Sequence, residues 1–114
     1  MGWQQLFEDD RKPIPVPNAW VKPEGLEVYV RRGQKLIEGK VQPTLEIANV
    51  RANQIGTGAL TRWVPEFESL ADKLGRIVFV ENVLNPRFRE FWSRRGYVLR
   101  PHLHDFCYWR PPAR

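Results

Sequence analysis

The stretch VENVLNPRFREFWSRRGYV, Val80–Val98, predicts a helix with one aromatic face. Counted from Asn85, aromatic residues follow at steps of three, six and seven, and a Gly-Tyr pair follows at eleven and twelve. These positions are Phe88, Phe91, Trp92, Gly96 and Tyr97. Side chains three and four residues apart share one face of a helix, and glycine is a common helix end. Because proline is favoured in the first helical turn, we expect the helix to begin at Pro86.

The segment before this stretch predicts another helix and a buried strand. Apolar residues from Leu60 to Leu74 fall on one helical stripe, and Gly75 is well placed to cap its carboxyl end. Pro65 interrupts the stripe. Proline is tolerated without loss only in the first turn, so the helix either begins near Arg62 or kinks. The run RIVFVEN that follows is a short apolar strand of the kind found in a sheet interior.

The amino-terminal half predicts three strands. Residues 1–25 hold four prolines and are expected to be mostly extended and irregular. LEVYVRR, from Leu26, alternates as a strand does, and Gly33-Gln34 can turn the chain into KLIEGKV as a hairpin. TLEIANVRA, from Thr44, is a third strand, and a β-bulge near Asn49 would explain the change in its apolar phase.

The order of the elements predicts the fold class. Two short strands, YVLR and DFCYW, follow the second helix. The order of strands, helix, strand, helix, strands is typical of an α/β or α+β fold with a mixed sheet of about six strands. The crossover that leads to RIVFVEN is long enough for parallel neighbours. We expect one domain over residues 1–114, with the sheet and helices in 26–109.

The composition indicates a basic, reduced protein. The 114 residues carry a formal charge of +5, and the single Cys107 excludes an internal disulfide. No apolar run approaches the roughly 20 residues of a membrane span, and the N-terminus lacks a signal layout, so we expect a soluble, cytoplasmic protein without a membrane partner. The charge favours a polyanionic partner, but the basic residues are scattered and nucleic acid is not the favoured one. The oligomeric state stays open, a homodimer included.

A glycine-rich junction lies between the third strand and the first helix. In NQIGTG, Asn53–Gly58, Gly56 and Gly58 flank Thr57. Backbone N–H groups at such a helix N-terminus can bind phosphate oxygens. The junction lacks the third glycine of a dinucleotide fingerprint and the lysine of a P-loop, and taken alone it is most often a turn.

The junction and the Asn-led helix together resemble the Gcn5-related N-acetyltransferase (GNAT) superfamily. In that family a loop of Arg or Gln, two residues, Gly, one residue and Gly or Ala grips the pyrophosphate of coenzyme A. A second signature has the steps that run here from Asn85 to Tyr97. The resemblance covers Leu26 to Trp109 and implies a GNAT-like sheet with reduced or missing N-terminal helices. In size the chain is similar to the small family members encoded by bacteriophages.

The resemblance implies a coenzyme A site built from a strand end, the loop and the second helix. Asn85 would face the pantetheine arm where two parallel strands splay apart, in an open gap lined by Asn49–Ala52 and Asn82–Asn85. The implied cofactor-binding residues are Val50, Arg51, Ala52, Gln54, Ile55, Gly56, Thr57, Gly58, Ala59, Asn85, Phe88, Arg89 and Trp92.

Three features depart from the family pattern. Asn53 stands where Arg or Gln is usual, with Gln54 or Arg51 as substitutes. Trp92 stands where a tyrosine commonly protonates the departing thiolate, and an indole N–H donates a hydrogen bond but has no usable proton to give. The first fifty residues are too short and too proline-rich for the two helices that usually wall the acceptor groove.

Glu46 and Glu81 are the candidate catalytic residues. Glu46 lies on the strand that enters the loop and Glu81 ends the next strand, so either can act as base toward an amine, directly or through water. The alternative is that each is a solvated or paired carboxylate. His102 and His104 have no third ligand beside them, so no metal site is expected.

These features predict an acetyl-CoA-dependent N-acyltransferase that acts on an amine of a protein or small molecule. The acceptor itself is not specified. The alternative is a catalytically inactive GNAT-fold module that binds a protein or nucleic-acid partner, which Trp92, the short N-terminal segment and the basic charge favour.

Overall fold

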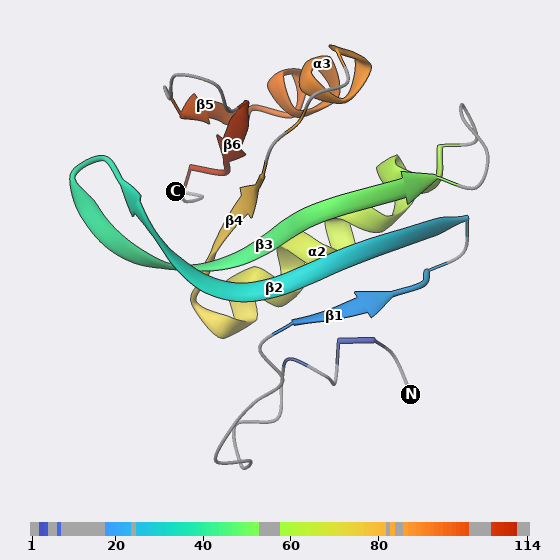
Figure 1. Ribbon diagram of the computed structural model, residues 1–114, viewed down its shortest axis with the longest axis horizontal. Coiled ribbons are helices and arrows are strands. Elements are labelled where there is room, and N and C mark those ends of the chain that lie inside the picture. The colour runs from blue at the N-terminus through green and yellow to red at the C-terminus, as the bar shows by residue number, and fades with distance from the viewer. Residues whose placement is uncertain are drawn as a thin grey trace.

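The computed structural model of the protein describes residues 3–4, 7, 18–23, 25–52, 58–81, 83, 86–100 and 106–111. Its strands and helices follow the chain in the order β1 (Asn18–Val21), β2 (Leu26–Ile37), β3 (Lys40–Ala52), α2 (Ala59–Leu74), β4 (Ile77–Val80), α3 (Pro86–Arg94), β5 (Val98–Arg100) and β6 (Cys107–Trp109). The six strands form one mixed sheet in the order β1-β2-β3-β4-β6-β5. Only β3 and β4 pair in parallel (Figure 1). The predicted fold class is confirmed.

The first hairpin turns later than the sequence predicted. β2 runs straight through Gly33-Gln34, and the turn lies at Glu38 and Gly39, between the paired residues Ile37 and Lys40. Glu38 and Gly39 have φ of 52° and 79°. Positive φ at both central residues is what a two-residue hairpin loop matched to the strand twist requires. The prediction of a turn at Gly33-Gln34 is therefore wrong.

β3 joins two segments that the sequence separates. It runs through Pro43, which lies opposite Gln34, and continues to Ala52 as one strand. The register shifts between the pairs Tyr29–Asn49 and Val30–Ile47, which leaves Ala48 as the extra residue of a bulge. The predicted β-bulge near Asn49 is confirmed.

α2 begins before its proline rather than at it. The helix starts at Ala59 and carries Pro65 in its interior, so of the two predicted alternatives the start near Arg62 is excluded. Pro65 and Thr61, whose carbonyl loses its helical partner, are both exposed, so water can bond that carbonyl. Gly75 caps the helix in the left-handed conformation with φ of 68°, as predicted.

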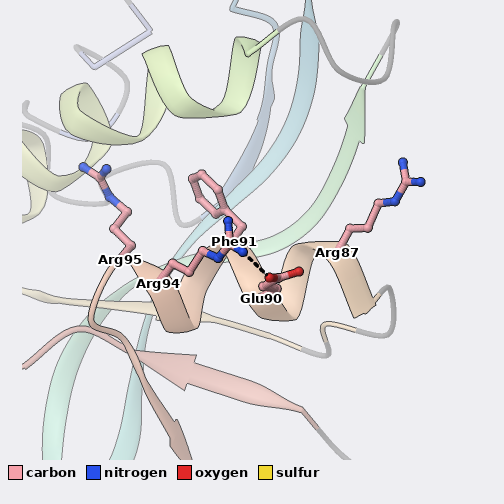
Figure 2. A pocket seen from close by; sticks show the side chains of 5 residues that line it. All are labelled: Arg87, Glu90, Phe91, Arg94 and Arg95. Atoms are coloured by element: carbon pink, nitrogen blue, oxygen red, sulfur yellow. Dashed lines mark ion pairs between the residues drawn. The ribbon is translucent and has the colours of Figure 1, made fainter.

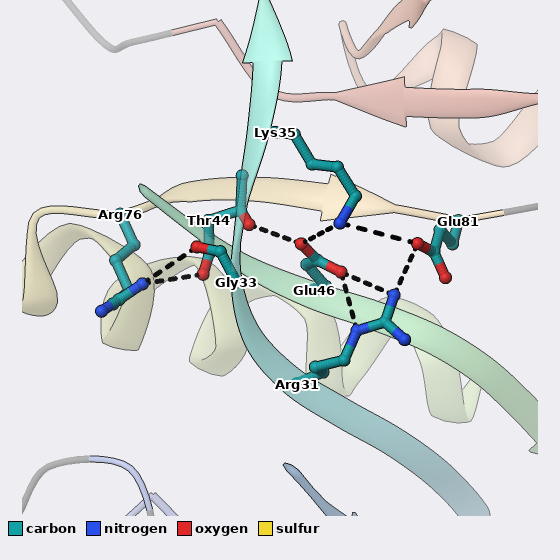
Figure 3. Close-up of polar contacts among 7 residues, drawn as sticks. All are labelled: Arg31, Gly33, Lys35, Thr44, Glu46, Arg76 and Glu81. Carbon is teal, nitrogen blue, oxygen red and sulfur yellow. Dashed lines mark hydrogen bonds and ion pairs between the residues drawn. The ribbon is translucent and has the colours of Figure 1, made fainter. Parts of the chain in front are cut away.

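The core lies between α2 and one face of the sheet. The buried stripe of α2 includes Trp63, Phe67 and Leu70, and it packs in one cluster with the inward residues of β2, β3 and β4. Trp92 of α3 belongs to the same cluster, and Tyr97 follows it at the helix end. The opposite face of the sheet carries charged side chains, and no helix in the described part of the chain covers it (Figures 1 and 3). No described helix is long and apolar enough to cross a membrane.

Candidate functional site

The parallel strands β3 and β4 separate at their carboxyl ends. Thr44–Ile47 pair with Ile77–Val80, and the last bond between the strands runs from the Glu81 N–H to the Ile47 carbonyl at 2.9 Å. β3 then stays paired with β2 as far as Ala52. The predicted parallel pair is confirmed, and it opens beyond Ile47.

β3 and β4 separate because β3 stays hydrogen-bonded to β2 and the chain after β4 stays hydrogen-bonded on the side of β6. After β4 the chain keeps to the side of β6, where the Val83 N–H donates to the Phe106 carbonyl at 2.7 Å. On the other side, the bulge at Ala48 falls directly after the last β3–β4 pair. A bulge bends its strand and strengthens the local twist, so it carries β3 away from β4.

The opening holds a cavity of about 220 Å³. Its walls come from the end of β3, the start of α2, the end of β4 and the inner face of α3. The lining residues are Ile47, Ala48, Asn49, Val50, Leu60, Val80, Glu81, Val83, Phe88 and Trp92. Glu81 is the one ionisable side chain among them, so the cavity is an apolar slot with a single carboxylate at its wall.

The helix α3 closes this slot with aromatic rings. Trp92 is 1% exposed and makes an edge contact with Phe91 and a tilted contact with Tyr97, each with ring centroids 4.9 Å apart. Phe88 lies one turn earlier, and the periodic spacing predicted from Asn85 places both rings on the cavity side. The Tyr97 hydroxyl lies outside the cavity and donates to Glu68 at 2.8 Å.

Glu46 lies beside the slot, on the uncovered face of the sheet, and does not line it. Its carboxylate is fully buried. One oxygen accepts from Arg31 Nε at 2.9 Å and Nη2 at 2.8 Å, and the other accepts from Thr44 Oγ1 at 2.6 Å and Lys35 Nζ at 2.9 Å (Figure 3). Burial alone would raise the pKa of Glu46, but the hydrogen bonds from Thr44, Lys35 and Arg31 outweigh it and hold the pKa below its usual value.

The same two cations connect Glu46 to Glu81. Arg31 Nη2 lies 2.5 Å from Glu81 Oε1, and Lys35 Nζ lies 3.8 Å from the same oxygen. The four charges therefore form one network that runs from the buried carboxylate to the cavity wall. Neither Arg31 nor Lys35 was predicted as a site residue. Alternate positions along a strand share one face, so the sequence did indicate that Arg31, Gly33 and Lys35 lie on the same side of the sheet.

The predicted cofactor residues that the structure describes lie in three different situations. Val50, Phe88 and Trp92 line the cavity. Arg51 is exposed, with its guanidinium 4.9 Å from the ring centroid of Trp20, and the guanidinium of Arg89 lies 4.1 Å from that of Phe106. Gly58 is the exposed N-cap of α2 with φ of 76°, and Ala59 is buried as the first residue of the helix. Gln54, Ile55, Gly56, Thr57 and Asn85 lie outside the described residues, as does the side chain of Ala52.

A larger cavity, of about 350 Å³, lies on the outer side of α3. It is lined by Arg87, Glu90, Phe91, Arg94 and Arg95 (Figure 2). Arg94 pairs with Glu90 at 2.6 Å, and Arg95 pairs with Glu68. Arg94 and Arg95 are thus engaged with carboxylates of the helices, and the cavity lacks the exposed strand edges of the smaller cavity.

No cluster of three or more His, Cys, Asp or Glu in the described part of the chain could hold a metal ion. His102 and His104 lie outside that part. Cys107 is a buried thiol on β6.

Similarity to known proteins is visible in structure and not in sequence. No protein-family model matches the sequence, and no curated protein matches it. The structure of the AtaT toxin, a mutant form bound to the C-terminus of the antitoxin AtaR and acetyl-CoA, matches with a TM-score of 0.58 and 15% identity, over 75% of this chain and 57% of that chain. The KacTA–DNA complex matches with a TM-score of 0.61 and 16% identity over the same shares.

The anti-CRISPR protein AcrVA5 is similar over its whole length. Its TM-score is 0.62 at 11% identity, over 84% of this chain and 100% of that chain. The chain spans 57% of the length of the AtaT and KacTA chains. The agreement in fold, with the splayed parallel pair and the two helices in the expected order, shows that the protein has a GNAT-like fold.

Proposed function

We propose that this protein is an N-acyltransferase that uses acetyl-CoA as donor. The observation that carries the proposal is the slot between β3 and β4, which is apolar, open and edged by Glu81. The AtaT structure of similar fold contains acetyl-CoA. The acceptor is a primary amine of a protein or small molecule, and the site of action is the cytoplasm.

The coenzyme A arm enters the slot along the free edge of β3. Beyond Ile47 the β3 backbone has no β4 residue beside it, so its polar groups can bond the amides of the pantetheine arm. The pyrophosphate lies at the N-terminus of α2, where Gly58 is the N-cap and the first N–H groups of the helix have no intrahelical acceptor. Gln54, Gly56, Thr57 and Asn85 are the remaining proposed contacts.

The reaction is a direct acyl transfer. The amine nitrogen attacks the thioester carbonyl carbon, a carbon–nitrogen bond forms, the carbon–sulfur bond breaks, and the coenzyme leaves as a thiolate. Backbone N–H groups of β3 beside the slot stabilise the carbonyl oxygen as it gains negative charge. Glu81 accepts the proton of the amine, directly or through one water, because it is the only ionisable group among the described residues of the slot wall.

Thiolate protonation is left to water in this site. Trp92 occupies the position nearest to the family's usual acid and can only donate a hydrogen bond. Burial, together with the hydrogen bond to Glu68, raises the pKa of Tyr97, and its hydroxyl points to Glu68 rather than to the slot. Water can replace the acid because a thiol is a good leaving group with a pKa near 8.5.

A second candidate function is a non-catalytic module that binds nucleic acid. The observation that favours it is the arginine-lined cavity of α3, where Phe91 supplies an aromatic ring between cations. The ion pairs of Arg94 and Arg95 must open for this to happen, so we favour the enzyme.

A thermal-shift titration separates the two functions. Acetyl-CoA at a hundred times its dissociation constant should stabilise the fold by about 2.7 kcal/mol, and coenzyme A should act similarly. A single-stranded DNA oligonucleotide should have no effect. A shift with DNA and none with either coenzyme would replace the enzyme by the module, and no shift with any of the three would remove both.

A further inference from the structure

We infer that Glu46 is a positioning residue for Glu81: it takes up part of the positive charge of Arg31 and Lys35, so that the carboxylate on the slot wall stays fixed in place and still able to accept a proton. The role that we infer for Glu46 rests on the proposed function, but the contacts from which it is argued do not. It assigns different roles to the two carboxylates that the sequence left equivalent.

Glu46 is not placed to take a proton from an amine. Its side chain is fully buried and lies outside the slot lining. Each oxygen already accepts two hydrogen bonds, from Arg31 twice and from Thr44 and Lys35. A buried carboxylate with this many donors is held in the charged form, so it is a weak base that no substrate can reach.

Glu81, in contrast to Glu46, is accessible from the slot. It lines the slot and its side chain is 29% exposed, so an amine in the slot can approach it. Arg31 reaches both carboxylates with the same nitrogen, 2.8 Å from Glu46 and 2.5 Å from Glu81. Lys35 lies nearer to Glu46, at 2.9 Å, than to Glu81, at 3.8 Å. Both cations are therefore shared: Lys35 lies nearer to Glu46, and Arg31 contacts Glu46 with two nitrogens and Glu81 with one.

The number of charges around Glu81 explains why it matters that Glu46 shares the two cations. Two cations facing Glu81 alone would favour its charged form strongly, since one opposite charge within about 4–6 Å lowers a carboxylate pKa by about 1–3 units. A carboxylate in that state takes a proton from an amine less readily. Glu46 balances the two cations so that the network holds two positive and two negative charges. Arg100, the nearest charge from β5, lies over the Phe79 ring at 5.0 Å.

Gly33 shows that the strand pair is built around this buried carboxylate. A Cβ on Gly33 would come within 2.6 Å of Glu46 Oε2, closer than any side chain tolerates. Arg76 Nη1 bonds the carbonyls of Gly33 and Thr44, at 3.3 and 3.2 Å, from the far side of the pair (Figure 3). A side chain here would push Glu46 out of its hydrogen bonds, so glycine serves the packing against Glu46, and a turn has no part in it.

The inference is tested by titrating the glutamate carboxyl carbons by ¹³C NMR in the full chain. Glu81→Gln assigns the Glu81 signal by its loss. In Glu46→Gln the midpoint of Glu81 should fall, because Arg31 and Lys35 then act on it alone. Lys35→Met removes one cation instead and should raise the midpoint. An unchanged midpoint in Glu46→Gln would overturn the inference.

The same variants report on catalysis when acetyl-CoA is offered with a panel of primary amines, a lysine-containing peptide and an aliphatic polyamine. Glu46→Gln should lower kcat about tenfold or more and move the acid limb of the pH profile to lower pH, with KM for acetyl-CoA unchanged. A variant that loses stability but keeps the wild-type profile would make Glu46 merely structural. Absence of turnover in the wild type would count against the proposed function, while the NMR titration still decides the role of Glu46. If Glu46→Gln does not fold, Gly33→Ala decides it, because its Cβ would displace Glu46 Oε2 from Lys35 and should also lower the midpoint of Glu81.

Discussion

Trp92 illustrates how one residue can serve both the core and the candidate site. It is 1% exposed, packs against Phe91 and Tyr97, and lines the slot with its other edge. Removing a buried indole leaves a large void, so Trp92→Ala should lower the free energy of unfolding by about 3–5 kcal/mol. Trp92→Phe keeps a ring and should cost about 1–2 kcal/mol. Urea unfolding measures both, and equal losses would mean that the ring is not packed as the structure has it.

A tyrosine at the same position tests the missing acid. Trp92→Tyr places a phenol toward the slot, and if thiolate protonation limits turnover, kcat with acetyl-CoA should rise while Trp92→Phe leaves it unchanged. The two variants differ by one hydroxyl and are therefore matched. Equal kcat values for Tyr, Trp and Phe would show that protonation by water is not limiting.

Single residues also show where the sequence was and was not sufficient. The aromatic steps after Asn85 are local, so the helix, its face and the stop at Gly96 could be predicted. The network of Arg31, Lys35, Glu46 and Glu81 could not, because it depends on which residue of β2 lies opposite which residue of β3. Placing the turn at Gly33-Gln34 gives a different register, and register decides the pairing of every side chain.

Among the elements, the N-terminus of α2 carries the proposed phosphate site. Gly58 has φ of 76° and is exposed, and a Cβ there would lie 3.3 Å from Arg62 Nη1 at the N-terminus of the helix, where the pyrophosphate is proposed. Asp and Asn both tolerate this backbone region and have the same size, so they form a matched pair. Gly58→Asp should weaken coenzyme A binding by at least tenfold more than Gly58→Asn, because only Asp adds a like charge. Isothermal titration of the two folded variants measures this, and equal affinities would remove the site.

The junction of α2 with α3 predicts acid sensitivity. Glu68 of α2 accepts from Arg95 after α3, through Nε at 3.0 Å, and from the Tyr97 hydroxyl at 2.8 Å. Burial alone would raise the pKa of Glu68, but these two hydrogen bonds outweigh it and hold the pKa below its usual 4.5. A group with a lowered folded-state pKa stabilises fully above its unfolded value and loses that stabilisation as the pH falls through the folded value. Glu68 therefore contributes stability that is present above about pH 4.5 and lost below it.

This contribution can be isolated by urea unfolding at pH 6.5 and pH 3. The wild type should lose more unfolding free energy between these pH values than Glu68→Gln, which has no carboxylate to protonate. Glu66→Gln is the control, since Glu66 is an exposed residue of the same helix and should behave as the wild type. The pKa of Glu46 is also lowered, but Glu46 is present in all three proteins, so it does not affect the comparison. Equal losses in the wild type and Glu68→Gln would show that the junction does not hold α2 to α3.

Element boundaries were predictable where a local cap sets them. Gly75 at the end of α2 and Pro86 at the start of α3 lie where the sequence placed them. The start of α2 was not predictable from Pro65, because an exposed helix face can leave one carbonyl to water. The turn was misplaced because Gly33 and Glu38-Gly39 are both candidate turn positions. Gly33 packs against Glu46 across the strand pair and forms no turn.

At the scale of the whole molecule, the sheet divides two tasks between its faces. One face packs against α2 and holds the apolar core, and the other carries the charge network of β2, β3 and β4. The slot opens between the two faces. It lies at the point where β3 stays paired with β2 and the chain after β4 stays beside β6. The parallel neighbours could be predicted from the length of the crossover. The divergence also depends on the bulge, which the change in apolar phase predicted, and on the bond from Val83 to Phe106, which no local pattern encodes.

If the slot holds the acyl donor, filling it should abolish binding without unfolding the chain. Val50 lies on β3 at the slot and is partly buried, and Val50→Trp adds an indole to a cavity of about 220 Å³. Val41→Trp is the matched control, since Val41 lies on the same strand near the hairpin turn and is 68% exposed. Overpacking at Val50 should cost about 1–3 kcal/mol, which thermal melting measures. We expect Val50→Trp to lose the stabilisation by acetyl-CoA and Val41→Trp to keep it. A folded Val50→Trp that still binds acetyl-CoA as the wild type does would place the donor elsewhere and leave the fold as the only likeness to the acetyl-CoA-bound toxin.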